Sequence, residues 1–280
     1  MKLLRYGPPG QERPGLLDGA GRIRDLSAHV PDIAREVLLP DSLGRLAALD
    51  PETLPLVEGT PRIGPCVGEV RKFVAIGLNY ADHAAEAGLS VPSEPVVFNK
   101  WTSCICGPDD DLILPEGSVK TDWEVELGVV IGAPARRVPE ERALDHVAGW
   151  CVVNDISERE WQNEHGGTWD KGKGFDGFGP IGPWLVTRDE LPGPDGLSLW
   201  LEVDGRRVQQ GSTDTMIFGV PRLIAYCSAL MTLLPGDIIT TGTPPGVGMG
   251  QKPPVFLRGG ETMRLGIDGL GVQTQRVRRA

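Results

Sequence analysis

The chain has 280 residues, of which 40% are hydrophobic, and a formal net charge of -10 from 28 Lys and Arg against 38 Asp and Glu. This composition supports a sizeable core in one or two domains. The acidic excess argues against general nucleic-acid binding. No apolar run is long enough to cross a membrane and no signal-peptide pattern opens the chain, so we expect neither a nucleic-acid nor a membrane partner.

The cysteine, glycine and proline contents indicate the compartment and the fold class. The five cysteines are odd in number and form no Cys-x-x-Cys pair, which favours a reduced, cytoplasmic protein. The 38 glycines and 25 prolines make turns frequent. We therefore expect strands and loops to outweigh helices.

Residues 1–68 are expected to form a small leading α/β module. Residues 3–6 predict a short strand, residues 15–24 predict a hairpin, and residues 40–48 predict a short helix. A linker rich in proline and glycine follows, so the second domain is expected to cover residues 69–280. Nothing in the leading module points to chemistry.

A buried strand and a short helix are predicted at the start of the second domain. Residues 73–77 are an apolar run, and residues 79–88 have a helical pattern that ends on glycine. His83 and Glu86 are three residues apart, so they share a helix face and can touch. A histidine that donates one ring N–H to a carboxylate keeps its other nitrogen free as a base. An ordinary pair on a helix surface has the same spacing, and both interpretations stay open here.

The stretch 122–132 reads as a strand that carries two carboxylates on one face. Glu124 and Glu126 alternate with apolar residues, and their charges repel unless a cation or water lies between them. A solvated strand face is one interpretation. A second apolar run, 149–155, ends in Asp155, and three carboxylates delivered by two strands suit a hard divalent ion. We predict Mg²⁺ or Mn²⁺ rather than zinc, because no Cys or His lies nearby at ligand spacing.

The glycine-rich stretch 167–174 nearly matches a phosphate-binding loop, but it lacks the chemistry of one. Gly174 follows the lysine, so no hydroxyl is available for magnesium, and the next residues cannot start the required helix. Lys171 and Lys173 remain of interest, because a lysine near a bound anion can neutralise developing enolate or carboxylate charge. A solvated loop lysine is the alternative.

Farther along, residues 199–209 predict a hairpin that turns at Asp204–Gly205, and residues 220–234 predict a helix packed on the sheet. The hydroxyls and backbone N–H groups of residues 241–243 stand at a strand end, where they are suited to holding a small carboxylate.

In order and spacing, five motifs resemble those of the fumarylacetoacetate hydrolase family, and the resemblance covers most of the chain. No single motif would be specific, but the set is. The motifs are Gly-Leu-Asn-Tyr-Ala-Asp-His-Ala-Ala-Glu (77–86), Asp-Trp-Glu-Val-Glu-Leu (122–127), Asn-Asp-Ile-Ser-Glu-Arg-Glu-Trp-Gln (154–162), Lys-Gly-Phe-Asp-Gly-Phe-Gly-Pro-Ile-Gly-Pro (173–183) and Pro-Gly-Asp-Ile-Ile-Thr-Thr-Gly-Thr-Pro (235–244). The leading module looks like the branch labelled ureidoglycolate lyase or diketo-deoxy-sugar-acid hydrolase.

The resemblance implies a β-rich α+β protein whose catalytic domain is a mixed β-sandwich roll, usually dimeric, with a divalent metal. It implies metal-binding carboxylates, a water-activating pair on a segment that closes over substrate, a lysine facing the substrate oxyanion, and residues that line the substrate pocket. The matching positions are, in that order, Glu124, Glu126 and Asp155; His83 and Glu86; Lys173; and Arg159, Gln162 and Thr243. The run 169–172 departs from the family pattern, and the sequence does not say what it recognises.

The implied reaction is hydrolysis of a C–C bond in a small 2-oxo acid, either an acylpyruvate or a 2,4-diketo-3-deoxy sugar acid, to pyruvate and a second acid. His83, oriented by Glu86, would take a proton from the attacking water, and Lys173 would help neutralise the departing enolate. Oxaloacetate decarboxylation or ureidoglycolate cleavage would use the same enolate without water. A non-catalytic protein that binds metal and oxo acids is the alternative of another class, although binding alone needs no general base.

Overall fold

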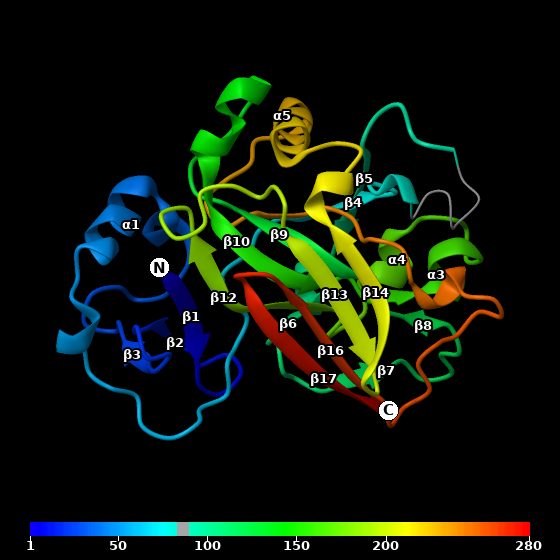
Figure 1. The fold of residues 1–280 in the computed structure, drawn as a ribbon, viewed down its shortest axis with the longest axis horizontal. Helices are drawn as coiled ribbons and strands as arrows, with labels where there is room; N and C mark the ends of the chain where they lie inside the picture. Colours follow the sequence, from blue (N-terminus) through cyan, green and yellow to red (C-terminus); the bar gives the residue numbers. More distant parts are fainter. Residues whose placement is uncertain (83–89) are drawn as a thin grey trace.

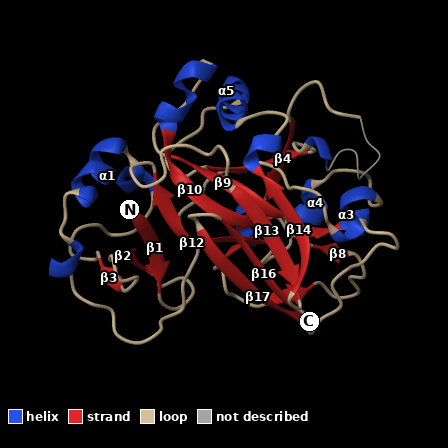
Figure 2. Cartoon of the chain, in the orientation of Figure 1, coloured by secondary structure: helices blue, strands red, loops and turns tan. Residues whose placement is uncertain are grey.

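The computed structural model describes residues 1–82 and 90–280, and two mixed β-sheets form its centre (Figures 1 and 2). The larger sheet has ten strands, of which β6 (Ile105–Cys106) pairs with β12 beside the main path. The main path runs, in spatial order, through β3 (Ile23–Asp25), β2 (Arg13–Leu17), β1 (Lys2–Tyr6), β12 (Gly179–Thr187), β10 (Val147–Asn154), β9 (Val125–Ile131), β15 (Ile238–Thr240), β4 (Phe73–Gly77) and β5 (Val96–Lys100).

A five-stranded sheet packs against the middle of the larger one, over β9, β10 and β12 (Figure 1). Its strands, in spatial order, are β14 (Arg206–Ser212), β13 (Ser198–Val203), β16 (Thr262–Ile267), β17 (Gly271–Arg279) and β7 (Leu112–Leu114). The strands β8 (Thr121–Asp122) and β11 (Ser157–Glu158) pair antiparallel and form a separate two-stranded sheet. The predicted β-rich α+β class with a mixed sandwich is confirmed.

The helices lie around the sandwich rather than inside it (Figure 2). The α-helices that lie wholly within the described residues are α1 (Pro40–Ala47), α3 (Arg159–Asn163), α4 (Asp170–Lys173) and α5 (Val220–Leu230). The 3₁₀ helices are η1 (Arg35–Leu38), η2 (Pro51–Thr53), η3 (Thr102–Cys104), η4 (Glu140–His146), η5 (Thr213–Thr215) and η6 (Gly248–Gly250). Within residues 1–82 and 90–280, no helix has the length and apolar character needed to cross a membrane.

The leading module has the predicted elements, and it joins the larger sheet. The strand β1, the β2–β3 hairpin and the helix α1 lie where the sequence placed them. β1 also pairs antiparallel with β12, with Leu3 opposite Leu185. Because this pairing continues the ten-stranded sheet, strands of the module and of the following region share one layer. The domain boundary at residue 68 stays a prediction.

The predicted hairpin at Asp204–Gly205 is confirmed, whereas the predicted helix 220–234 is too long. Asp204 and Gly205 both have positive φ, at 49° and 76°, as a tight hairpin turn requires. The helix α5 ends at Leu230, and Leu233 then pairs in extended conformation with Ala135 through two backbone hydrogen bonds of 2.9 Å. A tertiary strand contact therefore replaces the last turn that the apolar spacing suggested.

Glycine at position 149 allows β10 to approach β12. A Cβ atom there would lie 2.2 Å from the carbonyl oxygen of Val186 and 2.9 Å from the Cα of Thr187, both of them backbone atoms. Gly149→Ala should therefore lower the free energy of unfolding by about 1–3 kcal/mol, as overpacking typically does. The measurement is urea unfolding followed by circular dichroism.

Gly19→Ala is the matched control, because a Cβ at Gly19 meets nothing within 4 Å. It should change the unfolding free energy by less than about 0.5 kcal/mol. Equal stability of the two variants would contradict the close β10–β12 packing.

Candidate metal centre

The pairing of β9 with β10 brings the three predicted metal ligands onto one face of the larger sheet. Glu126 lies directly opposite Val153 in the antiparallel ladder. Two residues further along, the backbone N–H of Asp155 donates to the carbonyl of Glu124 at 2.9 Å. Because side chains alternate along a strand and opposed residues share a face, Glu124, Glu126 and Asp155 point the same way.

The other face of β9 and β10 looks into the sandwich. Asn154 lies opposite Val125, and its side-chain amide donates to Gln275 Oε1 of β17 at 3.1 Å. The backbone N–H of Val125 donates to Gln209 Oε1 of β14 at 3.0 Å. The carboxylates therefore occupy the face that is turned away from the five-stranded sheet.

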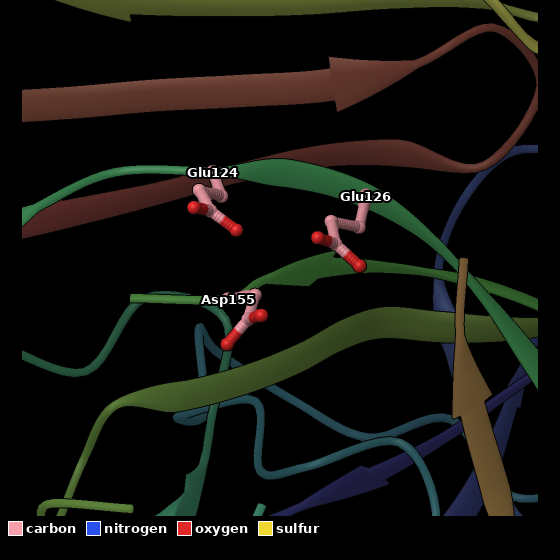
Figure 3. A group of neighbouring side chains, drawn as sticks. All are labelled: Glu124, Glu126 and Asp155. Atoms are coloured by element: carbon pink, nitrogen blue, oxygen red, sulfur yellow. The ribbon is translucent and has the colours of Figure 1, made fainter. Parts of the chain in front are cut away.

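The three carboxyl groups converge within a buried site (Figure 3). One oxygen of each lies within 4.8 Å of the others. Glu124, Glu126 and Asp155 are only 6%, 1% and 0% exposed. The interpretation of the Glu-x-Glu pattern as a solvated strand face is therefore wrong.

Two of the three carboxylates are matched by cations. Lys173 Nζ lies 2.7 Å from both Glu124 Oε2 and Asp155 Oδ2. Lys100 Nζ lies 2.7 Å from Asp155 Oδ1, and Arg159 Nη2 lies 2.6 Å from Glu124 Oε1. These ion pairs offset much of the cost of burying both carboxylates.

Glu126 has no such partner among the described residues. Its Oε2 accepts hydrogen bonds from the Thr240 hydroxyl at 2.5 Å and the Gly242 N–H at 2.9 Å, and both donors are neutral. Burial, followed by the charges of Asp155 and Glu124, raises the pKa of the Glu126 carboxyl well above its ordinary value. The site thus contains a buried carboxyl group with no ion-pair partner among the described residues, and a proton competes there with any cation that could bind.

Counting the neighbouring Asp122, the described cluster has four carboxylates against the three cations Lys100, Arg159 and Lys173, a formal balance of -1. A divalent ion fits this donor set, because hard ions prefer carboxylate oxygens. With Mg–O distances of about 2.1 Å, adjacent ligand oxygens are about 3.0 Å apart and opposite ones about 4.2 Å, so three oxygens within 4.8 Å of one another can close onto one ion by side-chain adjustment. The triad could hold a metal ion.

Arg159 is fixed at the start of α3 by a network of hydrogen bonds. Its Nε and Nη2 contact Asp122 Oδ2 at 2.9 and 2.8 Å, and its Nη1 donates to Gln162 Oε1 at 2.9 Å. The Asp122 carboxylate also accepts the N–H groups of Gly248 and Met249 at 2.6 and 3.0 Å. This network orients Gln162 as well as Arg159.

Lys173 ends the short helix α4, which lies close against α3. A Cβ on Gly172 would lie 2.4 Å from the carbonyl of Glu158 and 2.6 Å from Gln162 Cβ, so glycine allows this approach. No helix follows Lys173, as the rejection of a phosphate-binding loop predicted. Lys171 donates to the carbonyl of His165 at 2.6 Å and does not contact the triad.

Most of the predicted site residues line one cavity of about 100 Å³. Those in the lining are Glu124, Glu126, Arg159, Gln162, Lys173 and Thr243. Asp155 is fully buried beside the lining. The hydroxyl of Thr243 donates to the Val125 carbonyl at 2.9 Å and accepts from Gln209 Nε2 at 2.8 Å. The predicted general base His83 and its orienting residue Glu86 lie outside the described residues.

The sequence interpretation missed Lys100 and gave Asp122 no role. Lys100 is completely buried, and its Nζ also donates to the backbone carbonyl of Lys173 at 2.5 Å. The available signal was the same one that singled out Asp155, namely an apolar run that ends abruptly in a charged residue. Asp122 opens the Glu-x-Glu stretch, but only its long-range contacts reveal that it anchors Arg159.

Glu126→Gln tests whether the triad holds a metal. Loss of this ligand should weaken Mn²⁺ binding by at least the roughly 10–100-fold that loss of an outer-shell partner typically costs. The metal-free variant should also melt about 2 °C or more above the metal-free parent, because a buried carboxylate without a cation is removed. Calorimetric titration and thermal unfolding measure the two effects.

Glu116→Gln, at an exposed position, is the matched control and should change neither quantity. Unaltered Mn²⁺ affinity in Glu126→Gln would exclude Glu126 as a ligand. A large fall in its metal-free melting temperature would show that the charge is already matched.

Comparison with known proteins agrees with this geometry. Residues 72–278 match the family model described as fumarylacetoacetate (FAA) hydrolase, C-terminal. The chain is 73% identical over 281 residues to a Burkholderia cenocepacia protein named "Putative hydrolase", and the match covers 100% of both.

Two solved structures also resemble the whole chain. Fumarylacetoacetate hydrolase from the psychrophilic Exiguobacterium antarcticum is 33% identical with a TM-score of 0.89, and 100% of each chain is covered. Maleylpyruvate hydrolase from Sphingobium sp. SYK-6, solved in complex with manganese(II) ion and pyruvate, is 29% identical with a TM-score of 0.82 and the same coverage. The chain therefore belongs to the fumarylacetoacetate hydrolase family.

Proposed function

We propose that the protein is a hydrolase that uses Mg²⁺ or Mn²⁺ to cleave a C–C bond in a 2,4-dioxo acid. The substrate would be an acylpyruvate or a 2,4-diketo-3-deoxy sugar acid, and the products pyruvate and a second acid. The observation that carries the proposal is the buried carboxylate of Glu126, unmatched by a described cation, beside a cavity that Lys173 and Gln162 also line. The manganese and pyruvate in the Sphingobium relative support it.

Glu124, Glu126 and Asp155 would hold the ion. When bound, it would supply Lewis-acid stabilisation of negative charge at the 2-oxo acid end of the substrate. The ammonium group of Lys173 already contacts Glu124 and Asp155, so it adds a fixed positive charge at the edge of the cavity.

Gln162 is suited to bind the carboxylate of the substrate. Its Oε1 is occupied by Arg159, which leaves the Nε2 group without a hydrogen bond to any described residue. Because the side chain lines the cavity, these N–H groups can donate to a substrate oxygen. Arg159 would act mainly by holding Gln162 in this orientation.

His83, oriented by Glu86, would act as the general base. It takes a proton from water as the water oxygen adds to C4 of the substrate. The C3–C4 bond then breaks, its electron pair passes to C3 and is delocalised onto the C2 oxygen, and the second acid leaves. Return of a proton to C3 gives pyruvate.

Turnover of a panel of acids tests this function. With added Mn²⁺, acylpyruvates or diketo-deoxy sugar acids should release pyruvate, whereas ureidoglycolate should give little product. Thorough chelation should abolish the reaction, and Mn²⁺ should restore it. Activity that survives chelation would exclude the metal mechanism, and binding of 2-oxo acids without turnover would favour a non-catalytic binding protein.

His83→Ala separates water activation from enolate stabilisation. Hydrolysis should fall by about 10²–10⁴-fold, the usual contribution of a general base. Any oxaloacetate decarboxylation should fall much less, because that reaction needs no attacking water. Equal losses in both reactions, with metal still bound and the fold intact, would exclude His83 as the base.

We also propose a homodimer, because symmetric dimers are the commonest assemblies and the family resemblance implies one. Light scattering at working concentration should give twice the 30.1 kDa chain mass. A monomeric mass would contradict this assembly.

A further inference from the structure

The cavity beside the triad is lined by apolar side chains as well as by the charged ones. The wall residues come from β4 and the residue directly after it, from β5, from the residue before α4, and from η6. They are Ile76, Leu78, Phe98, Trp169 and Met249. Lys173 Nζ lies 5.4 Å from the centre of the Phe98 ring, so the apolar wall begins directly beside the charged end of the site.

Two aromatic rings make the wall rigid. Phe98 and Trp169 meet edge to face, with their ring centres 5.3 Å apart. The indole also lies on the end of β4, where a Cβ at Gly77 would lie 2.2 Å from the ring. Trp169 belongs to the run that departs from the family pattern, and this packing gives that residue a place at the cavity.

Leu78 occupies a backbone conformation that a bulky side chain rarely adopts. Its φ is +52°, in the left-handed region. The next residue, Asn79, is fully buried and holds this turn, with its amide donating to the carbonyls of Thr241 and Phe218 at 2.8 and 3.0 Å. Strain that neighbouring contacts maintain is typical of functional sites, and here it keeps an apolar side chain at the cavity.

Except for the Nε2 group of Gln162, most polar side chains in the lining already have partners within the protein. The hydroxyl of Thr243 both donates and accepts, and Asn163 donates to the sulfur of Met249 at 3.9 Å. A polyol in this part of the cavity would lose hydrogen bonds to water and find few described partners. An apolar group makes no hydrogen bonds to water, so it would lose none on entering the cavity.

We propose that the distal part of the substrate is an apolar acyl chain, held against Leu78, Phe98 and Trp169, and that Leu78 determines this specificity. The proposal rests on the proposed function for its choice of a 2,4-dioxo acid. It selects acylpyruvates over diketo-deoxy sugar acids, because the wall offers contact area rather than hydrogen bonds.

Binding of 2-oxo acids of increasing length tests the wall independently of turnover. With Mn²⁺ present, calorimetric affinities for 2-oxobutanoate, 2-oxopentanoate and 2-oxohexanoate should rise about fourfold for each added methylene. The value of kcat/KM should rise similarly from 2,4-dioxopentanoate to 2,4-dioxoheptanoate, and exceed that of a diketo-deoxy sugar acid at least about tenfold. Affinities and kcat/KM values that do not change with chain length, or a higher kcat/KM for the sugar acid, would overturn the proposal.

Leu78→Asn is the decisive variant, because asparagine tolerates positive φ and should preserve the fold. It should lower the affinity for 2-oxohexanoate about tenfold and flatten the chain-length series, while circular dichroism stays unchanged. Leu56→Asn, the same exchange at an exposed position outside the cavity lining, should leave the series intact. An unchanged series in Leu78→Asn would exclude Leu78 as a specificity determinant.

The two proposals fail in different ways. If affinity rises with chain length but no acid releases pyruvate, the proposed hydrolase function is wrong and the proposed apolar subsite is retained. If pyruvate is released but neither affinity nor kcat/KM changes with chain length, the proposed hydrolase function is retained and the proposed apolar subsite is wrong.

Discussion

A buried carboxylate without a described cationic partner is the constraint on which the site depends. Glu126 is 1% exposed and accepts hydrogen bonds only from neutral donors among the described residues. Burying such a charge is costly unless a cation neutralises it. Lys173, Lys100 and Arg159 are committed to the neighbouring carboxylates. A divalent ion at the triad would give Glu126 the cationic partner that it lacks and would change the formal balance of the cluster from -1 to +1, so the triad is best explained as a candidate metal site.

The fold holds this cluster in place with few elements. The β9–β10 ladder sets the three carboxylates on one face, and Lys100 at the end of β5 joins Asp155 to the backbone of Lys173. α3 contributes Arg159, which spans Glu124 and Asp122. Cations therefore come from segments that are distant in sequence, so the site forms only when the sheet and the short helices have assembled. The aromatic wall uses the same segments, since Phe98 lies on β5 and Trp169 directly precedes α4.

Much of this arrangement could be predicted from local sequence. Alternation identified Glu124 and Glu126 as a pair, and the abrupt end of an apolar run added Asp155. Partners set by tertiary contact could not be predicted: the apolar run that ends at Lys100 does not say which carboxylate this lysine contacts, and the Asp122–Arg159 contact joins residues 37 positions apart. The same limit explains α5, where pairing of Leu233 with Ala135 overrides apolar helical spacing. The roles of His83 and Glu86 stay predictions.

Anomalous diffraction from crystals grown with Mn²⁺ tests the central claim most directly. The account predicts one strong manganese peak within about 2.5 Å of an oxygen of each of Glu124, Glu126 and Asp155. It also predicts that Lys100 and Arg159 keep their contacts with the triad. The absence of a peak at saturating Mn²⁺, or a peak that Glu126 does not contact, would contradict the account.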